Sequence, residues 1–350
     1  MDCLGIILGC ERSGSTWLSN IVDAHPRVEF YMEPFAPILQ LFPELPDRHV
    51  YIAEPSPALL RALERGCGRL RSAKHPLGVY PGTPAGFARI ERRLLDLYGR
   101  VAAIAGGRSI LYDRYLVLNL NQRGPGSRVP HKQPPPIGAV FKELRLNFKI
   151  GVLAKTFPDA GYAVAIRHPG AQLGSILRLF SHGVLGELRA SLCTFVDRVR
   201  NMSRFEAYVP AMDELDGWRS DERVLLTLWW LVTHDVLLSD LERLGRPWLL
   251  VEHERASDDP HAAAAEVLDL FGLEQSDQVA DYIEWSTAAS EHTDHPISTR
   301  RKSADHYKRA IESIDAGMNR CIARVLQTMA RHVRLQASLD RYVRRFYELP

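Results

Sequence analysis

Short apolar runs alternate with stretches of helical spacing along this chain of 350 residues. The first run, LGIIL at residues 4–8, is continuous, as expected for a strand that is covered on both faces. A glycine-rich turn follows, and residues 15–24 then show the apolar spacing of a helix, which His25-Pro26 ends. Further strand candidates are residues 28–32, 109–112, 137–141, 163–166 and 248–251. This alternation predicts an α/β fold with a parallel, doubly wound sheet and helices on both faces.

Two regions depart from the alternation within what we interpret as one domain, residues 1–350. Residues 34–136 contain mixed helical patches and many turn residues, and they predict a cap insertion that shapes a substrate pocket. From residue 304 onward the pattern predicts an amphipathic helix that runs to the end of the chain and packs on the domain. The run LWWL at residues 228–231 has helical spacing and is interpreted as core.

Composition and charge exclude several classes of protein. With 44 basic and 42 acidic residues the net charge is +2, so any anion site must be local, and we expect no nucleic-acid partner. No apolar run approaches the roughly 20 residues that cross a bilayer, and the opening LGIILGC is too short for an export signal, so we expect no membrane partner. The five cysteines are scattered without CxxC spacing, which predicts no metal site and favours a cytoplasmic location.

The stretch GCERSGST at residues 9–16 nearly matches the phosphate-binding loop G-x-x-x-x-G-K-[ST]. Ser15 stands where that pattern has lysine. The backbone N–H groups of such a loop, and the helix dipole behind it, bind anions without the lysine, and Arg12 can supply the missing cation. A plain tight turn is the alternative. The polar residues around Gly14 favour a P-loop-like nucleotide site.

These residues carry a resemblance to a known family. RSGSTWL at residues 12–18, then Ala24-His25-Pro26 and Glu33-Pro34, resembles the start of sulfotransferases that use 3′-phosphoadenosine 5′-phosphosulfate (PAPS). The resemblance implies that the 5′-phosphosulfate is bound by Arg12, Ser13, Gly14, Ser15, Thr16 and Trp17.

A second motif, AIRHP at residues 165–169 followed by SILR at residues 175–178, resembles the family's strand-R-[DH]-P…S element. The resemblance implies that Arg167 and Ser175 bind the 3′-phosphate. Because Arg167 ends an apolar strand, it also lies where α/β sheets usually bind ligands. An ion pair at the strand end is the alternative for Arg167.

Later segments extend the resemblance to most of the chain, with residues 34–136 as the main gap. Residues 249–260 and 268–273 fit the family's order of motifs. The basic cluster at residues 298–303 resembles the loop that closes over the nucleotide in this family, which implicates Arg301 and Lys302. The alternative for this cluster is a charged turn.

Catalysis of sulfuryl transfer requires a base for the acceptor hydroxyl and a cation for the leaving oxygen. The resemblance implies that Glu33, in the Glu-Pro position, is the base. The alternatives are a Glu33 that pairs with a nearby arginine, and His25 as the base, although its place at a helix end favours a capping role. Lys142 follows the strand 137–141 and, with Arg12, would supply positive charge. The family's proline after this lysine is absent here, and a solvated lysine at a strand end is the alternative.

Two other functions compete with this interpretation. A P-loop kinase or NTPase would need lysine at Ser15, although Glu252 after a strand could mimic its acidic residue. A non-catalytic protein that binds anionic ligands is disfavoured by Glu33, because a carboxylate in an anion site repels the ligand. We therefore predict a PAPS-dependent sulfotransferase that acts on a hydroxyl-bearing small molecule, glycan or natural product. The sequence carries no motif that identifies the acceptor.

Overall fold

The computed structural model describes residues 2–35, 44–72, 135–180, 185–215, 217, 220–287 and 303–350. The strand candidate at residues 109–112 lies outside these residues, as do Arg301 and Lys302. Most of the predicted cap also lies outside them, namely residues 36–43 and 73–134.

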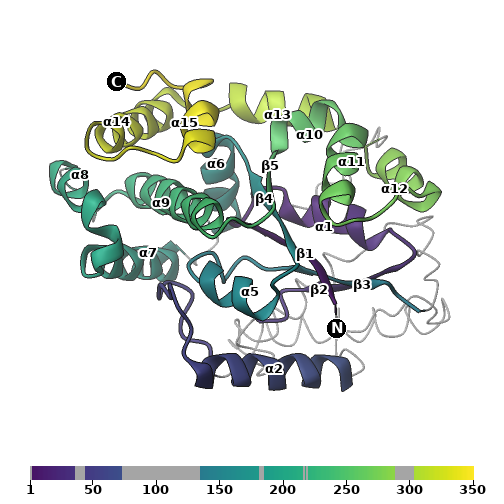
Figure 1. Cartoon of the computed structure of the whole chain (residues 1–350). Coiled ribbons are helices and arrows are strands. Elements are labelled where there is room, and N and C mark those ends of the chain that lie inside the picture. The colour runs from purple at the N-terminus through teal and green to yellow at the C-terminus, as the bar shows by residue number, and fades with distance from the viewer. Residues whose placement is uncertain are drawn as a thin grey trace, which may run out of the picture.

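One sheet of five parallel strands runs through the middle of the molecule (Figure 1). The strand order is β2-β3-β1-β4-β5, so β1 lies at the centre between β3 and β4. The five strands lie where the apolar runs predicted them, and the predicted fold class is confirmed. Their bounds are β1 Cys3–Gly9, β2 Val28–Met32, β3 Gly138–Lys142, β4 Gly161–Ile166 and β5 Trp248–Glu252.

Helices cover both faces of the sheet, which explains the continuous apolar runs. Along β1, Ile6 and Leu8 contribute to one hydrophobic cluster, and Ile7 between them contributes to the other. The cluster of Ile7 includes helices α1 (Ser15–Asp23), α10 (His253–Asp258), α11 (Pro260–Leu270) and α12 (Asp277–Thr287). The cluster of Ile6 includes helices α5 (Ile150–Thr156), α6 (Pro169–Phe180), α7 (Leu185–Arg200), α8 (Val209–Glu214) and α9 (Glu222–Arg243), and the 3₁₀ helix η2 (Ser203–Tyr208).

Helix α9 is the core helix of the larger cluster. Trp230 is fully buried and Trp229 nearly so, as predicted for this segment. Within the part of the chain that the structure describes, α9 alone is long and apolar enough to cross a membrane. Of its most apolar stretch of 18 residues, 94% is buried inside the protein. This helix contains no continuous apolar run of about 20 residues, because Thr233, His234 and Asp235 interrupt it, but its mean hydropathy is that of a helix buried on all sides.

The C-terminal region contains three helices instead of the single helix that was predicted. They are α13 (Ser303–Glu312), α14 (Ala316–His332) and α15 (Ala337–Arg344). The last two helices begin at side-chain N-caps. Asp315 accepts the N–H of Met318, and Gln336 accepts the N–H of Ser338.

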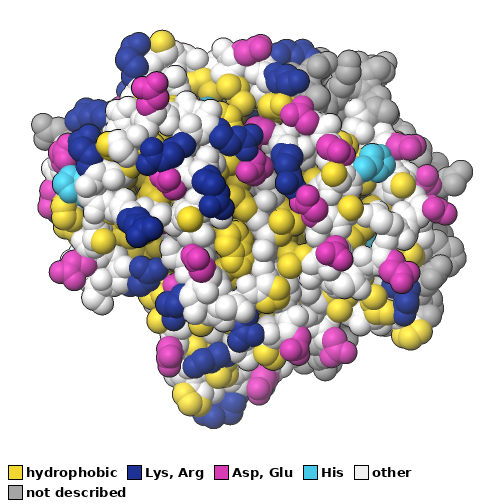
Figure 2. Space-filling view, turned by 45° about the horizontal axis from the view of Figure 1, so that its top comes forward, with side chains coloured by type: hydrophobic (Ala, Val, Ile, Leu, Met, Phe, Trp, Pro, Cys, Tyr) yellow, Lys and Arg dark blue, Asp and Glu magenta, His cyan; other side chains and the backbone are white. Residues whose placement is uncertain are grey.

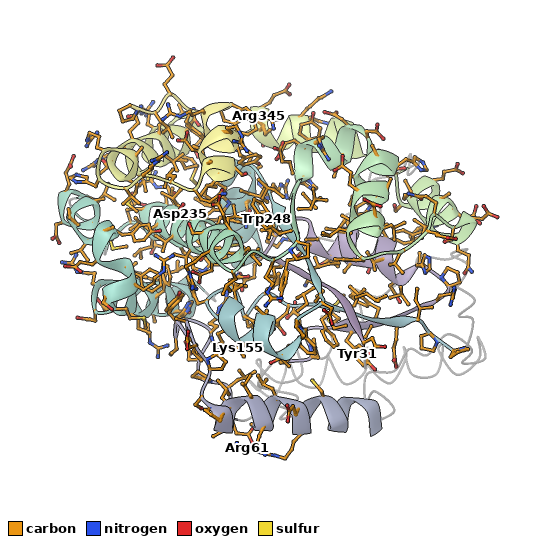
Figure 3. The ribbon with its side chains drawn as sticks, viewed as in Figure 1. Tyr31, Arg61, Lys155, Asp235, Trp248 and Arg345 are labelled. Atoms are coloured by element: carbon orange, nitrogen blue, oxygen red, sulfur yellow. The ribbon has the colours of Figure 1, made fainter. Side chains whose placement is uncertain are left out.

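The predicted packing of this region on the domain is confirmed. Asp235 of α9, labelled in Figure 3, accepts the backbone N–H of Gln336 at 2.6 Å, immediately before α15. It also accepts the Tyr208 hydroxyl at 2.5 Å, and burial raises the pKa of its carboxyl. A buried carboxylate with two donors therefore ties the last helices to the centre of the fold.

Helix α2 (Pro57–Ser72) is the described helix of the predicted cap region, and it packs against α5 (Figure 1). On the face shown in Figure 2, Lys and Arg side chains are mixed with Asp and Glu side chains, in keeping with a net charge of +2.

The strand order predicts where a ligand binds. From β1 the chain passes to β2, returns to β3 beside β1, and then crosses to β4 on the other side of β1. The loops after β1 and β4 therefore leave the same edge of the sheet as neighbours. In open α/β sheets this switch point forms a crevice at the carboxyl ends of the strands.

Candidate active site

The loop after β1 has the backbone conformation of an anion-binding turn. Gly14 has φ 94° and is the N-cap residue of α1, and its carbonyl accepts the N–H groups of Trp17 and Leu18. A side chain at Gly14 would meet His253, because an added Cβ would lie 2.6 Å from its Nδ1 atom. Arg12 has φ 67°, a left-handed conformation that costs a non-glycine residue about 1–3 kcal/mol and that is typical of functional sites.

The start of α1 is arranged to receive negative charge. Its N-terminus has no side-chain cap, and its first turn contains no acidic residue. The first N–H groups of a helix have no intrahelical acceptor, and the helix dipole favours an anion there. Ser13, just before this turn, is 1% exposed, and within the described part of the chain its hydroxyl has no hydrogen-bond partner. These features fit a phosphate or sulfate group.

The two predicted motifs meet at this loop. Arg12 Nε donates to Ser175 Oγ at 3.0 Å, across 163 residues of sequence. Arg167 Nη1 lies 3.5 Å from the carbonyl oxygen of Arg12. Arg167 and Ser175 are 6% and 9% exposed, so both lie in the wall of the site rather than on open surface. The structure therefore brings together Arg12, Arg167 and Ser175, which the resemblance assigns to opposite ends of one ligand.

Buried side chains fix the main chain around these arginines. Gln172 is fully buried, donates to the carbonyl of Glu11 at 2.7 Å and accepts from Trp230 Nε1 at 3.1 Å. Asn147 donates to the carbonyl of Gly9 at 2.9 Å, at the end of β1. No sequence pattern signals either role, because the partners of Gln172 and Asn147 are far away along the chain.

The turn after β4 is held in a similar way. Glu254 accepts the backbone N–H of His168 at 2.9 Å and the hydroxyl of Tyr342 at 2.8 Å. Burial, followed by the charge of Arg167, lowers the pKa of His168 to about 4, so this imidazole is neutral at pH 7. Arg167 thus lies between strand β4 and a turn that Glu254 holds through the N–H of His168.

Glu33 and Lys142 form an ion pair at the ends of β2 and β3. Lys142 Nζ lies 2.6 Å from Glu33 Oε1, and the backbone N–H of Glu33 donates to the Lys142 carbonyl at 2.7 Å. The Lys142 side chain is 2% exposed and that of Glu33 is 19% exposed. The solvated-lysine alternative was therefore wrong, and the partner of Glu33 is this lysine rather than an arginine. Like Arg12, Glu33 has a left-handed backbone, with φ 46°.

Glu143, next to this lysine, supports the same turn. It is fully buried and accepts the backbone N–H groups of Phe35 at 3.2 Å and Arg145 at 2.8 Å. Burial, followed by the charge of Glu33, raises the pKa of Glu143 to about 7. Glu143 directly follows Lys142, in the stretch where the family's proline is absent. Its carboxylate holds the segment after Glu33 through the N–H of Phe35.

Two other predicted residues point elsewhere. His25 lies beyond the far end of α1, where its Nδ1 accepts the N–H of Arg27 and its Nε2 lies 3.2 Å from the Glu274 carbonyl. The ring of His25 thus binds the turn that follows α1 and the segment before α12. The indole N–H of Trp17 donates to Ser286 Oγ at 3.1 Å, so this end of the ring faces α12.

The sulfotransferase family model matches residues 6–216, which is more than half of the chain. The matched segment includes the loop after β1, the Glu33–Lys142 pair and the Arg167 motif. The chain belongs to the sulfotransferase family. It is accordingly a transferase, and the family implies a PAPS co-substrate and an acceptor.

Solved sulfotransferases are similar to this one at low sequence identity. A sulfotransferase domain from the curacin biosynthetic pathway is 16% identical, with 100% of this chain and 99% of that chain covered and a TM-score of 0.38. Sulfotransferase STF9 from Mycobacterium avium is 17% identical, with 83% and 69% covered and a TM-score of 0.37. A sulfotransferase domain from the Synechococcus PCC 7002 olefin synthase is 16% identical, with 100% and 96% covered and a TM-score of 0.35. No curated protein matches the chain.

The kinase alternative has little support from this site. Glu252, the residue that could have mimicked a magnesium-binding acid, forms an ion pair with Arg345 after α15. Ser15, at the position of the P-loop lysine, is 3% exposed at the start of α1.

Proposed function

We propose that this sulfotransferase moves the sulfuryl group of PAPS to a hydroxyl group of an acceptor and releases 3′,5′-ADP. The observation that carries the proposal is the contact between Arg12 and Ser175, which joins the two anion-binding motifs in one site beside a carboxylate–lysine pair. The start of α1, Arg12 and Ser13 would hold the 5′-phosphosulfate. Arg167 and Ser175 would hold the 3′-phosphate.

Glu33 would act as the base in this reaction. As the acceptor oxygen attacks sulfur, its proton passes to the Glu33 carboxylate, and the bond from sulfur to the leaving phosphate oxygen breaks. Lys142 orients Glu33 before the reaction through the contact at 2.6 Å. Once Glu33 is protonated, the charge of Lys142 is no longer neutralised by its partner, so it can stabilise the negative charge that develops on the leaving oxygen.

The acceptor is proposed only by class, as a hydroxyl-bearing small molecule, glycan or natural product. No nucleic-acid partner is proposed, because the net charge is only +2. The five free cysteines support a further proposal, that the enzyme works in a reducing cytoplasm.

Thermal unfolding with two nucleotides tests the donor. A ligand that binds only the native state stabilises it by about 2.7 kcal/mol at one hundred times its Kd. We therefore expect 3′,5′-ADP to raise the Tm by several degrees, and ATP with magnesium to raise it much less. Equal shifts, or a shift with ATP and magnesium alone, would support a kinase instead. A screen of acceptors with PAPS, followed by mass detection of the added sulfuryl group, then identifies the acceptor.

A further inference from the structure

The loop proposed to bind the donor carries an acidic side chain of its own. Glu11 directly precedes Arg12, and its side chain is 34% exposed. Its carbonyl is fixed by Gln172, so the residue cannot move away from the loop without breaking a buried hydrogen bond. A carboxylate in this position repels a phosphate or sulfate group, unless a cation neutralises it.

Arg48 supplies that cation from the described part of the predicted cap. Its Nη1 lies 2.5 Å from Glu11 Oε1, and its guanidinium carbon lies 6.0 Å from the ring centre of Trp229. Burial would raise the pKa of Glu11, but the charge of Arg48, with a smaller contribution from Arg145, holds it below its ordinary value. Glu11 is thus ionised and paired.

The segment that carries Arg48 is itself held in place. Lys149 is fully buried, and its ammonium group donates to the carbonyls of Asp47 at 3.0 Å and Arg48 at 3.3 Å. The carboxylate of Asp47 pairs with Arg198 of α7 at 2.6 Å. Two hydrogen bonds to backbone carbonyls and one ion pair therefore hold the segment that carries Arg48.

We propose that Arg48 is a positioning residue for donor binding, which neutralises Glu11 and thereby lets the loop accept an anionic nucleotide. This inference rests on the proposed function, because it concerns the same anion site. It assigns Arg48 no direct contact with the donor. The effect of Arg48 on binding should therefore depend on the presence of the Glu11 carboxylate.

A double-mutant cycle tests that dependence. Arg48→Gln, Glu11→Gln and the double variant are titrated with 3′,5′-ADP by calorimetry. We expect Arg48→Gln to weaken binding about tenfold or more, which corresponds to about 1.4 kcal/mol. Glu11→Gln should bind as tightly as the native enzyme or more tightly. The double variant should recover affinity to within about threefold of the native enzyme, because the repelling charge has gone.

The ionic strength gives a second readout. Salt screens repulsion between separated charges, so the deficit of Arg48→Gln should shrink as salt is raised from about 0.05 M to 0.5 M. Arg65→Gln is the matched control, because Arg65 forms an ion pair with Glu44 in the same region, 3.5 Å apart and more exposed. This control should leave nucleotide affinity unchanged at each salt concentration.

The outcomes separate this inference from the proposed function. A native enzyme that fails to bind 3′,5′-ADP contradicts the proposed function. If the native enzyme binds but the double variant stays as weak as Arg48→Gln, then Arg48 contacts the ligand itself or serves only the fold, and the inference is overturned. Should Arg48→Gln fail to fold, Glu11→Gln alone remains decisive, because weaker binding by that variant would contradict a repelling role for Glu11.

Discussion

Replacing Glu33 with glutamine tests the proposed base, because the substitution keeps the size of the side chain and removes its charge. The amide oxygen can still accept from Lys142, but the ion pair at 2.6 Å is lost. Removing one partner of a buried pair costs about 3–5 kcal/mol, and the retained hydrogen bond returns about 1 kcal/mol. We therefore expect the variant to fold with a free energy of unfolding lowered by about 2–4 kcal/mol.

Turnover and binding should respond to this substitution in opposite directions. Loss of a general base costs about 10²–10⁴-fold in rate, which is about 2.7–5.5 kcal/mol in the activation barrier. The same change removes a negative charge beside the site of an anionic nucleotide, so affinity for 3′,5′-ADP should hold or improve. Sulfuryl transfer at saturating PAPS measures the first effect, and titration with 3′,5′-ADP at a temperature where the variant is folded measures the second.

Glu29, on the same strand as the segment before Glu33, provides a matched control for this test. Glu29→Gln makes the same change of charge at an exposed position of β2, and it should alter neither quantity. Near-normal turnover in Glu33→Gln would refute the assignment of the base, and His25 would be tested next. A loss of both turnover and nucleotide affinity would mean that Glu33 serves the shape of the site instead.

Two further substitutions test the donor anchors and the buried carboxyl group. In calorimetry, Arg167→Ala should weaken the binding of 3′,5′-ADP by about 1.5–3 kcal/mol and leave the binding of 5′-AMP nearly unchanged. Arg12→Ala should weaken the binding of both nucleotides. If Arg167→Ala weakens both equally, Arg167 does not bind the 3′-phosphate. The pKa of Glu143 is raised to about 7, so its contribution to stability is complete below about pH 4.5 and is lost as the pH rises through 7. In urea unfolding, stability relative to the native enzyme should therefore shift in favour of Glu143→Gln by up to about 3 kcal/mol between pH 5 and pH 8. A constant difference across that range would contradict the raised pKa.

The sheet was predictable from the sequence because its signal is local. Five short apolar runs mark the strands, of which β1, β3 and β4 are the most deeply buried, and their order along the chain fits a parallel sheet. The ends of the C-terminal helices were less predictable. Their caps, Asp315 and Gln336, look like ordinary polar positions of an amphipathic pattern until their N–H partners are seen.

The site was predictable only in part, for the same physical reason. The glycine loop and the Arg167 motif combine several constrained residues in a short stretch, so they could be identified directly. The partner of Glu33 stands 109 residues further along the chain, and Arg48 neutralises a residue 37 positions before it. Only the folded chain brings such charges together, and no spacing in the sequence marks them.

The contact between Tyr342 and Glu254 has a consequence for the synthesis of this protein. The carboxylate that holds the turn after Arg167 receives its hydroxyl partner from α15, 88 residues further along the chain. Until α15 has left the ribosome, the carboxylate of a nascent chain has the backbone N–H of His168 but lacks this hydroxyl partner. We therefore expect the turn after Arg167 to reach its final hydrogen bonding only after the last helix has been made, and a chain cut short before α15 to hold this turn less firmly.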